Sequence, residues 1–169
     1  MGSDKTVVNA ARVSFNKEIS KMRKSDEGLI AYLAKHKHWT PFGHAQLQFR
    51  ISAPVFIARQ LGKHQVGLVW NEVSRRYVDS DVSFYTPPVW RKRAENKKQG
   101  SSDDIIVYDD ILFSSYTKLL KASELLYDTL LEKGGAPEQA RMVLPQSMMT
   151  EWIWTGSLAA FARVVKLRD

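Results

Sequence analysis

The sequence predicts an α+β fold in which helices flank short strands. The segments lack the regular strand, helix, strand repeat that a doubly wound parallel sheet would require. The chain has 169 residues, of which 44% are hydrophobic and 25% are charged, an ordinary composition for a globular protein. This length is close to that of one average domain, so we expect a single domain over residues 1–169.

The first half of the chain carries alternating helix and strand signals. Ordered structure is expected from Asn9–Phe15 onwards. Gly28–Lys37 has apolar residues at helical spacing, and Trp39–Gly43 then breaks the chain with a proline and a glycine. Ala45–Ser52 alternates apolar and polar residues, which predicts a half-buried strand, and a proline precedes the helix expected at Val55–Leu61.

The second half contains the longest predicted helix. Arg91–Asp104 is polar and rich in charge, which predicts a solvated loop. Apolar residues then keep a 3.6-residue rhythm through Ile105–Glu132, and a glycine pair follows. A short helix is expected over Pro137–Leu144, a strand over Gln146–Thr155 and a final amphipathic helix over Ser157–Leu167.

Charge and composition restrict the classes of function. The net charge of +7 favours an anionic partner such as a nucleotide or a nucleic acid. The sequence contains no cysteine, which excludes disulfides, thiolate metal sites and a cysteine nucleophile. His36 and His38 lack the carboxylate spacing of known zinc motifs, so we expect no metal. No apolar run is long enough to span a membrane and no signal peptide is evident, so we expect a cytoplasmic protein without a membrane partner.

One segment, Arg59–Tyr77, concentrates the chemistry. It combines basic side chains such as Lys63, His64 and Arg75 with several amides and a hydroxyl. Guanidinium forks, a lysine and amides are the groups that bind a phosphate joined to a heterocycle. A solvated basic helix end followed by a polar loop is the simpler interpretation. The apolar residues that surround the segment argue against it, because buried polar groups need partners.

The same segment resembles the signature of flavin-dependent thymidylate synthases, the ThyX family, which is RHR, seven residues and then S. This chain has Lys63-His64-Gln65, eight residues and then Ser74, within NEVSRRY at Asn71–Tyr77. Lysine and glutamine therefore replace the two arginines, and one residue is inserted. Further blocks follow in family order: Ala10–Phe15, His38–Phe42, Pro54–Gln60, Ala140–Pro145, Trp154-Thr155 and Leu167-Arg168.

The resemblance implies a central antiparallel sheet flanked by helices, one of them long, in a homotetramer with active sites between subunits. It implies synthesis of dTMP from dUMP, with methylenetetrahydrofolate as carbon donor, NADPH as reductant and FAD as cofactor. This chemistry needs no enzyme cysteine, which agrees with the composition. Family members also continue with a further segment beyond the position of Asp169.

The resemblance also assigns roles to individual residues. Arg168 corresponds to the arginine that contacts uracil and His38 to a histidine near the flavin and folate, and both are expected to be catalytic. The expected substrate-binding residues are Gln60, Glu72, Ser74, Arg75, Arg76 and Arg141. The expected cofactor-binding residues are Ser14, Thr40, Lys63, His64, Gln65, Ser157 and Arg163.

Three alternatives stay open at this point. The Lys63 and Gln65 departures are compatible with a related flavin enzyme that acts on another pyrimidine nucleotide. The positive charge with interleaved aromatic residues is compatible with a nucleic-acid-binding module, although we expect no nucleic-acid partner. A homologue that binds nucleotide without catalysis is the third.

Overall fold

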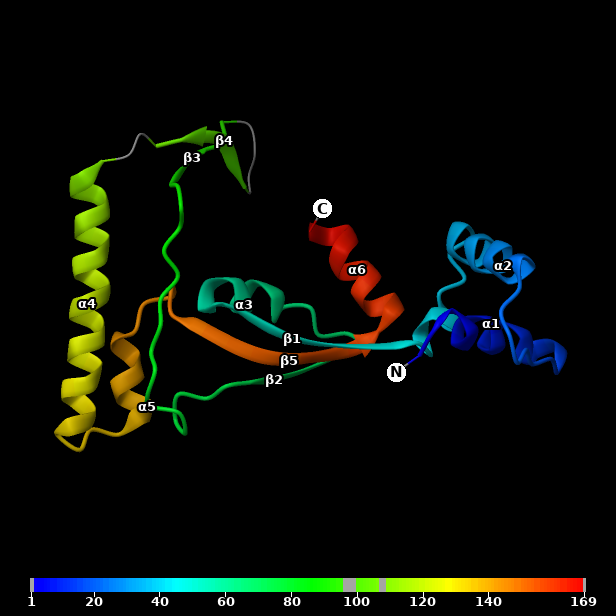
Figure 1. The fold of residues 1–169 in the computed structure, drawn as a ribbon, viewed down its shortest axis with the longest axis horizontal. Coiled ribbons are helices and arrows are strands. Elements are labelled where there is room, and N and C mark those ends of the chain that lie inside the picture. The colour runs from blue at the N-terminus through cyan, green and yellow to red at the C-terminus, as the bar shows by residue number, and fades with distance from the viewer. Residues whose placement is uncertain (1, 96–99, 107–108, 169) are drawn as a thin grey trace. The chain divides into compact units, whose positions relative to one another are not determined.

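The computed structural model describes residues 2–95, 100–106 and 109–168 (Figure 1). The chain forms two compact units. Unit 1 comprises Met1–Ser52, Arg59–Glu72 and Glu151–Asp169, and unit 2 comprises Ala53–Ala58 and Val73–Thr150. The architecture mixes helices with small sheets, as the α+β prediction requires. None of the helices in the described ranges is long and apolar enough to cross a membrane.

A three-stranded sheet organises unit 1. Its strands are β1 (Gln46–Pro54), β5 (Met149–Ser157) and β2 (Leu68–Glu72), with β5 in the middle, as Figure 1 shows. β2 and β5 are antiparallel. Burial alternates along β5 because successive side chains point to opposite faces. β2 has no counterpart in the sequence prediction, which assigned no helix or strand to Leu68–Glu72.

Stacked aromatic rings form the core of this sheet. Trp152 of β5 is 1% exposed and stacks on Trp70 of β2, with ring centroids 4.3 Å apart and an interplanar angle of 17°. Trp154 meets Trp70 edge-on at 5.6 Å. Phe161, on α6 (Leu158–Arg168), meets the Trp154 ring edge-on at 5.2 Å. Gly156 of β5 allows the backbone next to β2 to approach closely, because a Cβ at this position would lie 2.5 Å from the Gly67 carbonyl oxygen.

Two helices at the start of the chain complete unit 1. These are α1 (Asp4–Arg12) and α2 (Lys24–Lys35), followed by the 3-10 turn η2 (Thr40–Gly43). Helix α1 begins earlier than the order expected from Asn9, since Ser3 and Thr6 form a capping box at its first turn. Asp26 is fully buried, where it pairs with Arg12 and accepts a hydrogen bond from the Arg23 amide at 2.9 Å.

Unit 2 contains the long helix α4 (Asp110–Glu132) with α5 (Pro137–Ala140) packed beside it (Figure 1). The Asp109 carboxylate caps α4 by accepting the Ile111 amide hydrogen bond at 2.8 Å. The helix therefore begins at Asp110 and not at Ile105; residues 107–108 of the expected range lie outside the described chain. Tyr127 is fully buried on α4, and this burial raises the pKa of its hydroxyl.

The solvated loop expected at Arg91–Asp104 was a wrong prediction. A two-stranded antiparallel sheet stands there, made of β3 (Arg91–Arg93) and β4 (Ser101–Ile105). Most side chains of both strands are exposed. The strands therefore have the polar composition that is typical of a loop. They carry no alternation of apolar and polar residues from which a strand could be predicted. The strand expected over Gln146–Thr155 is shifted, since β5 begins at Met149.

Helix α3 (Val55–Leu61) follows β1 at the range that the sequence predicts. Its first two amides donate hydrogen bonds to the carbonyl oxygens of Met148 and Gln146, at 2.9 and 3.1 Å. These bonds satisfy donors that a helix start leaves without intrahelical partners. They also hold Phe56 beside the segment that leads into β5.

Candidate functional site

Three of the expected site residues meet at the end of α6. The Arg168 guanidinium donates from Nε to His64 Nε2 at 3.0 Å, and from Nη2 to the Gln60 carbonyl oxygen at 3.2 Å. A guanidinium carries only donors, so His64 Nε2 must accept. The residue expected to contact uracil is thus linked directly to one expected to bind flavin.

A hollow of about 220 Å³ adjoins this cluster within unit 1. Lys63, His64 and Gln65 line one side, and α6 lines the other with Arg163 among its residues. Arg163 Nη2 donates to the Val66 carbonyl oxygen at 2.6 Å. Gly67 follows with a φ of 76°, and a Cβ there would lie 3.3 Å from that of Ala160, so the turn favours glycine.

The charge of this hollow suits an anion. Its lining includes a lysine and an arginine and no carboxylate. A cationic, partly apolar hollow of this kind favours phosphate oxygens over cations. Four of the seven expected cofactor-binding residues, Lys63, His64, Gln65 and Arg163, therefore come together in a suitable environment.

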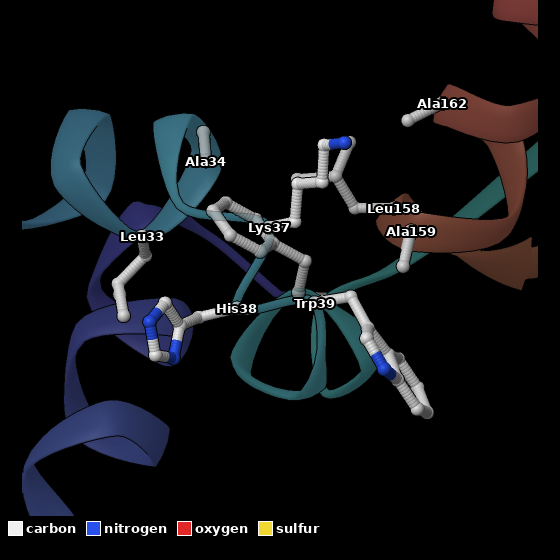
Figure 2. A pocket seen from close by; sticks show the side chains of 9 residues that line it. Leu33, Ala34, Lys37, His38, Trp39, Leu158, Ala159 and Ala162 are labelled. Atoms are coloured by element: carbon white, nitrogen blue, oxygen red, sulfur yellow. The ribbon is translucent and has the colours of Figure 1, made fainter.

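A second hollow, of about 330 Å³, holds His38. Figure 2 shows Leu33 and Ala34 on α2, Leu158, Ala159 and Ala162 on α6, and His38 and Trp39 on the segment that follows α2. Its walls are predominantly apolar, which suits a flat ring system. Lys37 precedes His38 with a φ of 58°, a left-handed conformation that is uncommon for lysine.

The remaining expected cofactor residues of unit 1 lie on turns or at an element end. Ser14 is exposed on the 3-10 turn Val13–Phe15, and Thr40 begins η2. Ser157 ends β5, and its Oγ accepts the Ala160 amide hydrogen bond at 3.2 Å. This bond satisfies an otherwise unpaired donor at the start of α6. Ser157 therefore has a structural role whether or not it contacts a cofactor.

Trp70 lines neither hollow, but it makes contacts on β2 that sequence reasoning missed. Its Nε1 donates a hydrogen bond to Glu72 Oε2 at 3.1 Å, while its ring stacks on Trp152. Residues two apart on a strand share a face, which brings the two side chains together.

Unit 2 carries the other expected substrate residues, in a turn after β2. Arg75 donates from Nη1 to the carbonyl oxygens of Val78 and Ser80, at 3.3 and 2.6 Å. Arg76 donates from Nε to Ser74 Oγ at 3.2 Å, and its guanidinium lies 5.1 Å from the centre of the Tyr77 ring. Arg75 thus braces the turn, whereas Arg76 and Ser74 form an exposed pair.

Arg141 lies elsewhere in unit 2, at the start of the 3-10 turn η3 (Arg141–Val143). Its Nε donates to the Glu138 carbonyl oxygen at 3.4 Å, and its side chain is exposed. Among the residues that the structure describes, no group of three or more histidines and carboxylates could hold a metal ion.

Comparison with known proteins gives a consistent result. The sequence profile of the family described as thymidylate synthase complementing protein matches residues 1–169. The flavin-dependent thymidylate synthase of Thermosipho africanus is 40% identical over 172 residues, covering 99% of this chain and 73% of the relative. That of Thermus thermophilus is 39% identical over 168 residues, and this chain spans 61% of its length.

A solved structure agrees with the sequence relatives. The UMP/dUMP methylase PolB from Streptomyces cacaoi, bound with 5-Br dUMP, superposes with a TM-score of 0.80 at 33% identity. The match covers 94% of this chain and 70% of PolB. The profile match over the whole chain, the identity to curated relatives and the shared fold together show that this chain belongs to the flavin-dependent thymidylate synthase family.

Proposed function

We propose that the protein makes dTMP from dUMP, with methylenetetrahydrofolate as carbon donor, NADPH as reductant and FAD as the bound cofactor. The observation that carries the proposal is the cluster of Arg168, His64 and Gln60 beside a cationic hollow. Support for the substrate comes from PolB, whose structure contains 5-Br dUMP. The reaction uses no cysteine nucleophile, and the sequence contains no cysteine.

The residues present fit FAD. The hollow at Lys63, His64 and Arg163 has the cations and the lack of carboxylates that a diphosphate requires. The apolar hollow at His38 and Trp39 has walls that suit a flavin ring. FAD supplies hydride transfer when it is bound. Ser14, Thr40, Gln65 and Ser157 are the further residues that we propose as cofactor contacts.

Arg168 acts electrostatically in this proposal. Its guanidinium stabilises negative charge that develops on the uracil ring, and it takes part in no proton transfer because it stays charged. The bonds to His64 and to the Gln60 carbonyl orient the guanidinium. For the phosphate and sugar of dUMP we propose Gln60, Glu72, Ser74, Arg75, Arg76 and Arg141, and for the folate and flavin, His38.

The test compares Arg168→Ala with Lys166→Ala, which removes an exposed positive charge from the same helix. Flavin absorbance, its bleaching by NADPH without oxygen, and conversion of dUMP are measured for each variant. We expect Arg168→Ala to lower dUMP turnover by roughly 10²-fold or more, as loss of an electrostatic stabiliser does. Lys166→Ala should match the wild type. Equal losses in the two variants would contradict the role of Arg168, and a protein that neither binds FAD nor converts dUMP would overturn the function.

A second candidate function is methylation of another pyrimidine nucleotide. PolB is described as a methylase of UMP as well as dUMP, and Lys63 and Gln65 depart from the family signature. The same assay with UMP and dCMP separates the candidates. Conversion of dUMP in preference to both supports dTMP synthesis, and conversion of UMP or dCMP alone supports the second candidate.

We also propose that the two units form one domain and that the protein works in the cytoplasm as a homotetramer. Support for assembly comes from α4, where Ile111, Leu119 and Leu125 are 75%, 57% and 69% exposed. Apolar side chains gathered on one exposed helix are typical of a protein interface. Light scattering on the preparation used for the activity assay gives the number of copies directly.

A further inference from the structure

Unit 2 contains a hollow of about 810 Å³ that none of the proposed catalytic residues lines. Aromatic rings from three parts of the chain form its walls: Phe56 on α3, Tyr85 and Trp90 on the segment before β3, and Tyr116 on α4. A volume of this size lies within the range of small-molecule sites. The dUMP, folate and flavin contacts proposed above leave this hollow without a role.

Hydrogen bonds to backbone carbonyl oxygens hold the walls in place. The Phe56 amide donates to the Gln146 carbonyl oxygen at 3.1 Å, and the Tyr85 amide donates to that of Ser147 at 2.8 Å. The Tyr116 hydroxyl donates to the Tyr85 carbonyl oxygen at 2.7 Å. The rings are thus preformed as a binding surface, which reduces the entropy lost when a ligand binds.

The packing of the aromatic rings leaves part of their surface exposed to solvent. Trp90 and Tyr116 meet edge to face at 5.4 Å and 86°, and Phe56 and Tyr85 are tilted at 6.2 Å. Trp90, Tyr85 and Phe56 are 38%, 37% and 42% exposed. Partly exposed aromatic faces in a fixed hollow bind flat rings by stacking.

Polar groups in the same hollow suit a heterocycle that carries an anion. Gln146 offers an amide, which can both donate and accept hydrogen bonds. The Ser147 hydroxyl is buried and has no hydrogen-bond partner within the described chain, so a bound molecule would satisfy it. Arg91 also lines the hollow, and its guanidinium forms a 3.3 Å ion pair with the fully exposed Asp103. Exposed pairs of this kind are weak and yield to a phosphate, which binds a guanidinium through two hydrogen bonds.

We propose that this hollow is a second nucleotide site, which binds a free mononucleotide with its base against Trp90 and its phosphate on Arg91. The proposal is independent of the proposed function, because none of its residues is assigned to the reaction. Stacking supplies the binding energy for the base, the Gln146 amide meets the base edge, and Arg91 selects for the phosphate.

Tryptophan fluorescence tests the proposal, with AMP, adenosine and inorganic phosphate as probes. Titrations contain no dUMP, because dUMP is itself a mononucleotide and would compete for the hollow. Arg168→Ala, which alters the proposed catalytic site, should bind AMP as the wild type does. We expect AMP to quench fluorescence saturably, and Trp90→Phe to abolish that quench while the protein keeps its circular dichroism. Arg91→Gln should raise the Kd for AMP roughly tenfold and leave adenosine binding unchanged.

Lys92→Gln is the matched control, since it removes the same charge from the same strand at a residue that does not line the hollow. Unchanged AMP binding in this variant supports the site, whereas equal weakening in both variants would show that only general charge matters. Absence of any quench at millimolar AMP overturns the proposal. A single-stranded oligonucleotide that binds more tightly than AMP, with a steep salt dependence, overturns it in favour of nucleic acid.

Discussion

The arginines expected at the functional site are held in different ways in the two units. In unit 1 Arg163 and Arg168 bind partners about a hundred positions away in the sequence, the Val66 carbonyl and His64. In unit 2 Arg75 and Arg76 bind partners within a few residues, inside one turn. The unit 1 arrangement therefore exists only when β2, β5 and α6 are assembled, whereas the unit 2 turn depends on its own short segment.

The largest expected effect comes from loosening the unit 1 sheet. Trp152→Ala removes a fully buried ring that stacks on Trp70, and it should lower the free energy of unfolding by about 3–5 kcal/mol. Thermal and urea unfolding measure the change. Val69→Ala, an exposed residue of the neighbouring strand, is the control and should cost less than about 0.5 kcal/mol. Equal effects of the two substitutions would show that the tryptophan stack does not hold the sheet.

A smaller and local effect is expected at the unit 2 turn. Arg75→Ala removes the bonds to the carbonyl oxygens of Val78 and Ser80, and it should change the free energy of unfolding by about 1 kcal/mol or less. The turn itself should become easier to cleave, because its backbone loses its brace. Limited proteolysis followed by mass spectrometry locates the cuts. Arg76→Ala should leave the cleavage rate unchanged, and a large global loss from Arg75→Ala would show that the turn is not locally determined.

The smallest expected effect is a pH-dependent change in stability from an ion pair on the unit 1 sheet. Arg50 binds Glu151 across β1 and β5 at 2.8 and 2.5 Å, and the hydrogen bond from Arg50 lowers the pKa of this carboxyl below its ordinary 4.5. A carboxyl with a lowered pKa stabilises the folded state above its unfolded pKa, and this contribution is lost as the pH falls through the folded pKa. Urea midpoints of wild type and Glu151→Gln should therefore differ slightly near neutral pH and converge below about pH 4. A difference that persists in acid would contradict the assignment.

Secondary structure could be predicted from the sequence where a local pattern of residues determines it. The α3 range follows from a proline before the helix and the amphipathic α6 from spacing, and the family motif directed attention to Lys63, His64 and Gln65, which line one hollow. The β3 and β4 strands could not be found, because exposed polar strands carry no alternation. The bond between Arg168 and His64 could not be found either, since nothing local encodes a contact between residues 104 positions apart. The stack of Trp70 on Trp152 was missed for the same reason, because the two tryptophans belong to strands that are far apart in the sequence.

The tryptophan stack of unit 1 also has an optical consequence. Two indole rings held nearly parallel at 4.3 Å couple their electronic transitions, which gives a paired positive and negative band in the ultraviolet circular dichroism spectrum. The sign pattern depends on the handedness of the pair, so it exists only while β2 and β5 lie in register. The protein therefore carries its own intrinsic reporter of strand pairing, which needs neither label nor cofactor nor substrate.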